Sequence, residues 1–107
     1  MDPLFHIVDF RRWSAAIAAG QYHAETLATE GFVHCSFRDQ VGGTLARHYP
    51  QVPGLIVVEL DAARIDAPVV VEDTTGGGVR FPHIYGAIPT AAAVATHEVT
   101  DFDRDRH

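Results

Sequence analysis

The hydrophobic positions at the start of the chain predict a strand followed by a helix. Residues 4–8 (LFHIV) are rich in residues that favour strands. Asp9 follows as a suitable helix N-cap, and Gly20 stands where a C-cap glycine belongs. Between them, three large apolar residues recur at helical spacing: Phe10, Trp13 and Ile17. We therefore expect a helix of about three turns with these residues on its apolar face.

The next segment predicts a second strand and a second helix. Residues 21–30 have no clean period and are expected to form a loop with a short turn. Residues 31–36 (GFVHCS) are expected to form a strand. Ser36 and Asp39 then resemble a capping box, so a helix should begin there and run to about Tyr49. The inner face of this helix is marked by Phe37, Val41 and Leu45.

The second half of the chain is predicted to be mostly strand. Residues 54–60 (GLIVVEL) have the strongest strand pattern, and residues 69–72 (VVVE) have a second one. The glycine-rich residues 74–79 predict a flexible loop. Residues 80–86 (RFPHIYG) look extended, but Pro82 cannot donate to a ladder, so an edge or irregular segment is expected.

The end of the chain predicts a short helical turn at residues 90–93, a last strand at about residues 94–99 and a charged, frayed tail. Helices and strands thus alternate first, and several strands follow. This order predicts an α+β fold with small mixed, mainly antiparallel sheets and two helices. We expect a single domain over residues 1–100, with residues 101–107 as the tail.

Composition narrows the class of protein. A chain of 107 residues with 47% apolar and 21% charged residues is typical of one globular domain. No apolar run approaches the roughly 20 residues that cross a bilayer, and no signal-peptide pattern opens the chain, so we expect a cytoplasmic protein. A single cysteine, Cys35, fits a reducing compartment. The net charge of −6 makes a nucleic-acid partner unexpected.

Seven histidines are many for a chain of this length, and three of them stand inside strand-like runs. Because side chains alternate between the faces of a strand, Val33 and Cys35 should point to one side and His34 to the other. The residues that should share a face with a histidine are Phe32, His34 and Ser36, then Phe81, His83 and Tyr85, and finally Leu4, His6 and Val8. Glu72 ends a run of valines, where a carboxylate needs a partner. The simplest explanation is a pocket that gathers these polar groups.

Each of these residues also has a purely structural explanation. A lone histidine among apolar residues is more often a hydrogen-bonded core residue than a catalyst. A role as helix N-cap is enough to explain Ser36, and a place in the core is enough to explain Tyr85. Glu72 can pair with Arg80 across the glycine loop. Cys35 has apolar neighbours and is expected to be an inert buried thiol.

Metal binding and phosphate loops have weaker support. The residue types of a metal site are present in His6, His34, Glu72 and His83. However, the chain has no HxH, HxxxH or HExxH spacing, so we assign no metal ligands. A metal-dependent enzyme stays open as an alternative. Residues 74–79 lack the following helix and the Lys-Ser/Thr pair of a phosphate loop.

Several motifs together resemble the bacterial family called domain of unknown function 952. The resemblance rests on GFVHCS, ARHY, LIVVELDAARI, VVVE and GGGVRFPHIYG and covers about residues 4–99. The family's motif positions fall on His34, Ser36, Glu72, His83 and Tyr85. The resemblance implies a fold similar to the ADP-ribosyltransferase superfamily, whose members bind NAD in a cleft between two small sheets. Some relatives of that fold remove a 2′-phosphate from RNA with the help of NAD.

The resemblance also implies roles for these residues. Breaking the nicotinamide–ribose bond develops positive charge on the sugar, which a carboxylate such as Glu72 would stabilise. His34 would hydrogen-bond a ribose hydroxyl or move a proton. By position, His83 or Glu72 would fill the third active-site position. Phe81 and Tyr85 would stack on a planar ring.

The expected function is therefore that of a small NAD- or nucleotide-handling transferase. The expected catalytic residues are His34, Glu72 and His83. The expected ligand-binding residues are His6, Ser36, Phe81 and Tyr85, with NAD as the candidate cofactor. A non-enzymatic protein that binds a nucleotide-like or anionic small molecule is the main alternative.

Overall fold

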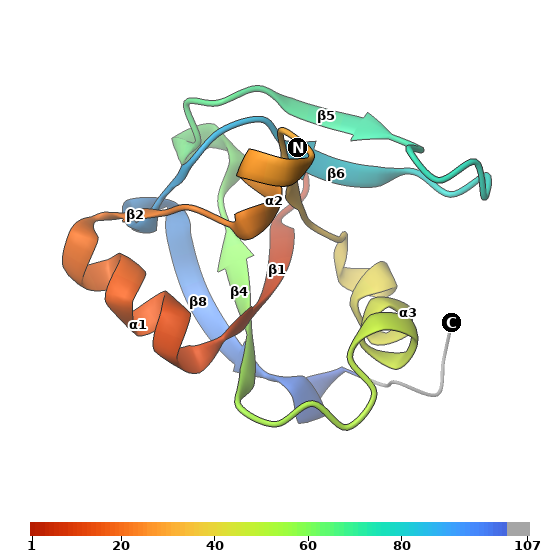
Figure 1. The fold of residues 1–107 in the computed structure, drawn as a ribbon, viewed down its shortest axis with the longest axis horizontal. Coiled ribbons are helices and arrows are strands. Elements are labelled where there is room, and N and C mark those ends of the chain that lie inside the picture. Colours follow the sequence, from red (N-terminus) through yellow and green to blue (C-terminus); the bar gives the residue numbers. More distant parts are fainter. Residues whose placement is uncertain (103–107) are drawn as a thin grey trace.

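The computed structural model describes residues 1–102, which fold into three small sheets and three α-helices (Figure 1). The helices are α1 (Phe10–Ala19), α2 (Glu25–Thr29) and α3 (Arg38–His48). The strands are β1 (Leu4–Asp9), β2 (Gln21–Tyr22), β3 (Val33–His34), β4 (Leu55–Leu60), β5 (Val69–Glu72), β6 (Phe81–Ile84), β7 (Ile88–Pro89) and β8 (Ala93–Glu98). The structure also has three 3-10 turns in these residues: η1 (Ala62–Arg64), η2 (Thr90–Ala92) and η3 (Val99–Asp101). The α+β class is confirmed.

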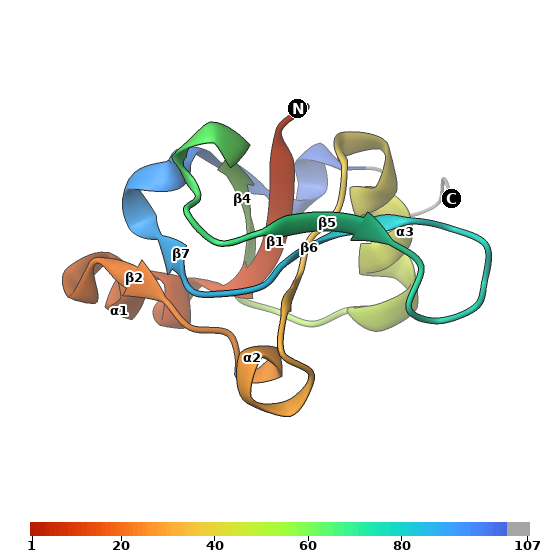
Figure 2. The same ribbon diagram turned by 90° about the horizontal axis from the view of Figure 1, so that it is seen from above.

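The sheets have the strand orders β1–β4–β8, β2–β7 and β3–β6–β5. Every strand pair among the described residues is antiparallel, so the sheets are not mixed there. Figure 2 shows β5 and β6 running together across the end of the β1–β4 pair. The strands expected at residues 4–8, 54–60, 69–72 and 94–99 are confirmed within one residue.

The β1–β4–β8 sheet carries apolar side chains on both faces because its strands are packed from both sides. On one face Val8 and Val58 pack with Trp13 of α1 and with Ile84 of β6. On the other face an aromatic and aliphatic cluster includes Phe5, Ile7, Val41, Leu45, Val57 and Phe102. Figure 1 accordingly shows α1 and α3 on opposite sides of this sheet. Residues 4–8 are all buried, which explains why β1 carries apolar side chains on both faces, with His6 as the one polar residue of this run.

Helix α1 begins and ends as its cap residues predict. The Asp9 carboxylate accepts the backbone N–H groups of Arg11 and Arg12, at 2.8 and 3.3 Å. Gly20 ends the helix with φ of +86°, a left-handed conformation that glycine adopts without strain. The expected apolar face was only partly right. Trp13 and Ala16 are buried, whereas Phe10 and Ile17 are each 58% exposed, so the inward stripe is narrower than the spacing suggested.

Helix α3 begins one residue later than the capping-box pattern predicted. Its N-cap is Phe37, and the Gln40 side chain reaches back to accept the Phe37 N–H at 2.9 Å. Ser36 is therefore not the N-cap, because its backbone is held in a bridge to Phe5 of β1. The expected inner face is confirmed at Val41 and Leu45, which are fully buried.

The position of Pro82 corrects a second expectation. Strand β6 is the central strand of β3–β6–β5 rather than an edge or irregular segment. Pro82 pairs with Val71 on one side, and its carbonyl accepts the Cys35 N–H at 3.0 Å on the other. A central proline is tolerated here because β3 is only two residues long and the pairing beside it uses the proline carbonyl, which needs no N–H.

The short turns expected within residues 21–30 and at residues 90–93 are present as α2 and η2, whereas β2, β7 and η3 were not predicted. β2 pairs with β7, and α2 forms a little over one turn. Phe102, expected in the frayed tail, is buried and packs edge-on against Phe5 with ring centroids 6.0 Å apart. The rest of the expected tail, residues 103–107, lies outside the described residues.

Candidate functional site

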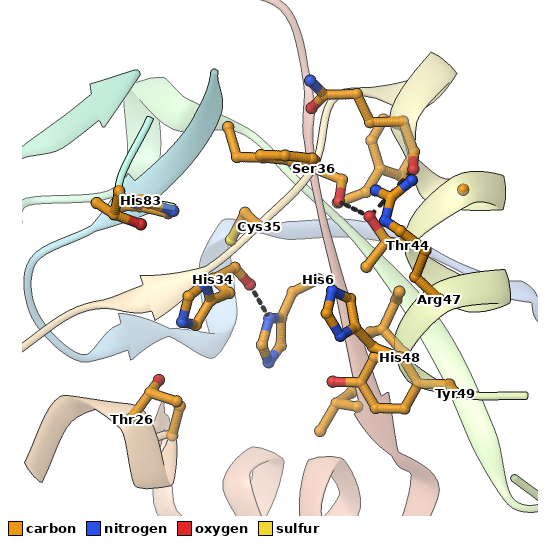
Figure 3. Close-up of a pocket in the computed structure, with 18 of the residues that line it drawn as sticks. His6, Thr26, His34, Cys35, Ser36, Thr44, Arg47, His48, Tyr49 and His83 are labelled. Carbon is orange, nitrogen blue, oxygen red and sulfur yellow. Dashed lines mark hydrogen bonds between the residues drawn. The ribbon is translucent and has the colours of Figure 1, made fainter. Parts of the chain in front are cut away.

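A cavity of about 970 Å³ opens along the free edge of β1. β1 is an edge strand of its sheet. Within residues 1–102 its free edge forms one backbone bridge, in which Phe5 and Ser36 exchange two hydrogen bonds of 2.8 Å. The remaining edge is flanked by α1, β2 and α2 on one side and by α3 on the other, and all of these elements contribute lining residues. Figure 3 shows His6 at the back of this cavity, between His34 and His48.

His34 and His83 face each other across neighbouring strands. They are register partners in the β3–β6 pair, and their ring centroids lie 5.1 Å apart. The alternation of side chains produces this meeting, because Val33 and Cys35 point into the core while the residue between them points away from it. Both histidines line the cavity. The predicted convergence of the two histidine motifs is therefore a feature of the structure.

Each of these two imidazoles has its own carboxylate. The Nδ1–H of His83 donates to Glu72 Oε2 at 2.9 Å. The Nε2–H of His34 lies 3.2 Å from both carboxylate oxygens of Glu30, at the end of α2. Glu30 was not singled out in the sequence, because the pair depends on how α2 turns back toward β3.

The second partner of Glu72 is Tyr85, whose hydroxyl donates to the same Oε2 atom. These two hydrogen bonds, from Tyr85 first and from His83 second, lower the pKa of Glu72 below its ordinary value, so the carboxylate is ionised near neutral pH. The same bond raises the pKa of Tyr85, which therefore stays a hydrogen-bond donor. Neither Glu72 nor Tyr85 lines the cavity. The alternative pairing of Glu72 with Arg80 is not found among the ion pairs of residues 1–102, where Glu72 pairs with His83.

His83 is 2% exposed and is packed under an aromatic ring. Phe32 stacks on it with centroids 4.2 Å apart and an interplanar angle of 22°. Phe32 also contacts His34 and Tyr85, at 4.9 and 5.3 Å. Among residues 1–102, no buried side-chain nitrogen or oxygen lacks a partner, and His83 Nε2 makes no hydrogen bond there. His83 is one of the residues that line the cavity, so its ring lies at the cavity wall.

His6 lines the cavity but uses both ring nitrogens within the protein. Nδ1 lies 2.7 Å from the carbonyl oxygen of His34, and Nε2 lies 3.2 Å from the Tyr22 hydroxyl. A carbonyl only accepts, so Nδ1 carries the proton and Nε2 accepts the Tyr22 O–H. Burial lowers the pKa of His6 to about 4, which keeps the ring neutral.

Ser36 and Cys35 occupy opposite sides of the same segment. The Ser36 hydroxyl lies 3.3 Å from Thr44 Oγ1, and the Thr44 hydroxyl donates to the Gln40 carbonyl at 3.1 Å. Ser36 thus joins a polar chain on the cavity wall. Cys35 belongs to the core cluster, and burial raises the pKa of its thiol far above the ordinary value. Its burial agrees with the expectation from its apolar neighbours, although Cys35 also contributes to the lining of the cavity.

The structure brings most of the predicted site together. Five predicted residues line the cavity: His6, His34, Ser36, Phe81 and His83. Lining residues that the sequence did not single out are Arg12, Thr26, Glu30, Thr44, Arg47, His48 and Tyr49. For the residues on α3, one sequence pattern could have indicated a shared position. Residues 40, 44, 47 and 48 recur at helical spacing on the polar side of the helix.

The described part of the chain shows neither a metal site nor a membrane-spanning helix. Residues 1–102 contain no group of three or more His, Cys, Asp or Glu side chains arranged to hold a metal ion. No helix in the same range is long and apolar enough to cross a membrane.

Comparison with known proteins agrees with the motifs. Two solved structures of protein CC0527 from Caulobacter crescentus are similar to this chain. The X-ray structure has a TM-score of 0.78 at 24% identity, over 88% of this chain and 82% of that one. The solution NMR structure has a TM-score of 0.72 at 22% identity, over 92% and 84%. Identities this low establish a shared fold alone. No curated protein matches this chain. The family profile described as a protein of unknown function (DUF952) matches residues 7–96, so the chain belongs to that family.

Proposed function

We propose that this protein is a small NAD- or nucleotide-handling transferase in which His83 moves the proton. The observation that carries the proposal is the arrangement of His83, whose Nδ1 is bonded to Glu72 while the residue lines the cavity. A carboxylate on Nδ1 fixes the tautomer and the ring orientation, which leaves the Nε2 lone pair to accept the proton of the water or acceptor hydroxyl that bonds to the ribose carbon as nicotinamide leaves. This is the geometry of a general base with its positioning carboxylate.

Glu72 takes a different part from the one expected from sequence. It lies outside the cavity, bonded to His83 and Tyr85, so it acts through His83 and not directly on a sugar. Glu72 and Tyr85 are positioning residues in this proposal. His34, with Glu30 behind it and His83 beside it, is the second group within reach of the same ligand.

The cavity volume and its walls favour a nucleotide-like ligand. A volume of about 970 Å³ lies at the upper end of the roughly 300–1,000 Å³ typical of small-molecule sites. Phe81 offers an aromatic face next to His83, and the walls elsewhere carry hydroxyls, imidazoles and guanidinium groups. NAD is the first ligand to test, because the motifs resemble a family that is similar to the ADP-ribosyltransferase fold.

Calorimetry with NAD and a nicotinamide-release assay test this function. We expect NAD to bind and nicotinamide to be released, with His83→Gln lowering turnover at least a hundredfold. Glu72→Gln should lower turnover while leaving the dissociation constant for NAD nearly unchanged, since Glu72 does not line the cavity. His23→Gln is the matched control, because His23 is exposed and outside the cavity.

Two results would contradict the proposal in different ways. Binding of NAD without turnover, unchanged in His83→Gln, would favour the non-enzymatic ligand-binding alternative. No binding at millimolar NAD would exclude NAD as the ligand of the isolated chain. Elemental analysis of purified protein tests the metal-dependent alternative, for which stoichiometric metal would be required.

A further inference from the structure

The cavity has a cationic end that the proposed function does not use. Arg12 of α1 lines it from one side, and Arg47 and His48 of α3 line it from the other. Figure 3 shows Arg47, His48 and Tyr49 on the α3 side, across the cavity from Thr26 and beyond His6 when viewed from His34. Phe81 of β6 and the imidazoles of His34 and His83 line the same cavity. A ligand in it meets aromatic and imidazole groups as well as the positive charge of the arginines.

Five acidic residues also line the cavity, and their partners decide how far each one competes for Arg12 and Arg47. The carboxylates on its lining belong to Asp9, Glu25, Glu30, Asp39 and Asp73. Asp9 accepts the first backbone N–H groups of α1, and Glu30 is taken by His34. Asp73 accepts three backbone N–H groups of the following glycine loop. Asp9, Glu30 and Asp73 therefore have donors other than Arg12 and Arg47, whereas Glu25 contacts Arg12 itself.

Asp39 and Glu25 are the two carboxylates to weigh against an anion. Asp39 lies in the first turn of α3, eight residues from Arg47, or about 12 Å along the helix axis. Glu25 contacts Arg12 at 3.3 Å, but its side chain is 81% exposed, and an exposed ion pair of this kind contributes little. A competing anion on Arg12 therefore displaces a weak partner.

Arg47 is the least committed cation. Within residues 1–102, no carboxylate lies within 4.0 Å of its guanidinium, whereas Arg12, Arg38 and Arg64 each have one. Tyr49 follows two residues later with a half-buried phenol, and burial raises its pKa, so its hydroxyl stays a donor. The last turn of α3 carries the negative end of the helix dipole, so an anion must contact these side-chain tips and not the helix terminus.

We infer that the ligand of this cavity carries a phosphate group, which binds between Arg47 and Arg12 with His48 and Tyr49 as further donors. A phosphate offers several strong acceptor oxygens on one centre, which matches donors arriving from α1 and α3. Arg47 is the main anchor of this phosphate subsite. This inference rests on the proposed function only for the identity of the whole ligand. The phosphate subsite itself is defined by the four residues named above.

Inorganic pyrophosphate is the probe for this subsite. In amide and arginine-side-chain NMR spectra, we expect pyrophosphate to shift the signals of Arg47, His48 and Tyr49 and to leave those of β8 unchanged. Arg47→Gln should weaken pyrophosphate binding about tenfold or more, as expected for the loss of a charge-assisted hydrogen bond. Arg11→Gln is the matched control, because Arg11 is exposed and does not line the cavity.

The outcomes separate this inference from the proposed function. If NAD binds and Arg47→Gln binds it equally well, the phosphate subsite is wrong and the proposed function stands. If NAD does not bind but pyrophosphate binds in an Arg47-dependent way, NAD is excluded and the subsite stands. Unchanged spectra with millimolar pyrophosphate overturn the subsite. Equal binding of citrate would overturn the preference for phosphate over carboxylate.

Discussion

His6 is a buried residue whose two ring nitrogens both form hydrogen bonds within the protein. Its ring ties β1 to the backbone of His34 through Nδ1 and to Tyr22 through Nε2, so it holds three segments of the cavity wall in place. A ring with both nitrogens used has no group left for a ligand. His6 therefore helps to hold the site together. The ligand-binding role expected from the sequence stays a prediction, and the two internal hydrogen bonds argue against it.

Stability should depend on pH through His6. Its pKa falls from 6.5 to about 4 on folding, so between these values the unfolded chain binds a proton that the folded chain does not. The free energy of unfolding should therefore fall as pH is lowered, by about 2 kcal/mol between roughly pH 7 and pH 5. Urea unfolding at several pH values measures this fall.

His6→Asn provides the comparison, because the asparagine amide retains a donor for the His34 carbonyl and does not titrate. The variant should show a flatter pH dependence over the same range. An identical slope in both proteins would mean that another group is responsible. Glu72 and Asp73, whose pKa values are lowered, lose their contributions only at more acidic pH.

At the scale of elements, cap residues predicted both ends of α1 but placed the start of α3 one residue too early. Asp9 and Gly20 predicted both ends of α1, since each acts through its own local backbone. The place of β6 in its sheet was missed, because whether Pro82 sits at an edge depends on which strands arrive beside it. Elements of two to five residues, such as β2 and α2, hold few side chains and are fixed by tertiary contacts that no local pattern encodes.

The glycine that ends the FPHIYG motif is required by the packing of two segments. A Cβ atom placed on Gly86, just after β6, would come within 2.7 Å of the Cβ of Ala67, just before β5. Gly86→Ala should therefore lower the free energy of unfolding by about 1–3 kcal/mol. Adding Ala67→Gly removes the clashing atom and should recover part of this loss in thermal unfolding. Additive losses in the double variant would refute the proposed contact.

At the scale of the whole molecule, one sheet serves two cores. The α1 side joins the central sheet to the sheet that carries His83, and the α3 side is closed by the C-terminal turn η3 and Phe102. Sequence patterns predicted the α+β class and the meeting of His34 with His83, because alternation along strands is a local property. They did not predict Arg12, Arg47 or Tyr49 at the cavity, because the position of a helix beside a strand edge follows from the assembled fold.

Phe102 tests the second core. It is 9% exposed and packs with Phe5, Val57 and the neighbouring aliphatic residues. Phe102→Ala should lower the free energy of unfolding by about 3 kcal/mol, measured by urea denaturation. Phe10→Ala is the control, since Phe10 is 58% exposed and its loss should change stability by less than about 0.5 kcal/mol. Equal effects of the two changes would show that the C-terminal turn adds nothing to the core.

The two-residue strand β3 makes chain length between Gly31 and Ser36 more critical than most of the side chains there. Its pairing with β6 and the bridge from Ser36 to Phe5 fix both ends of the segment. One inserted or deleted residue would reverse the alternation, which would turn Val33 and Cys35 outward and bury the imidazole between them. Related chains that keep this cavity should therefore accept other small apolar residues at position 35, but no change in the number of residues that separate the histidine from the bridge.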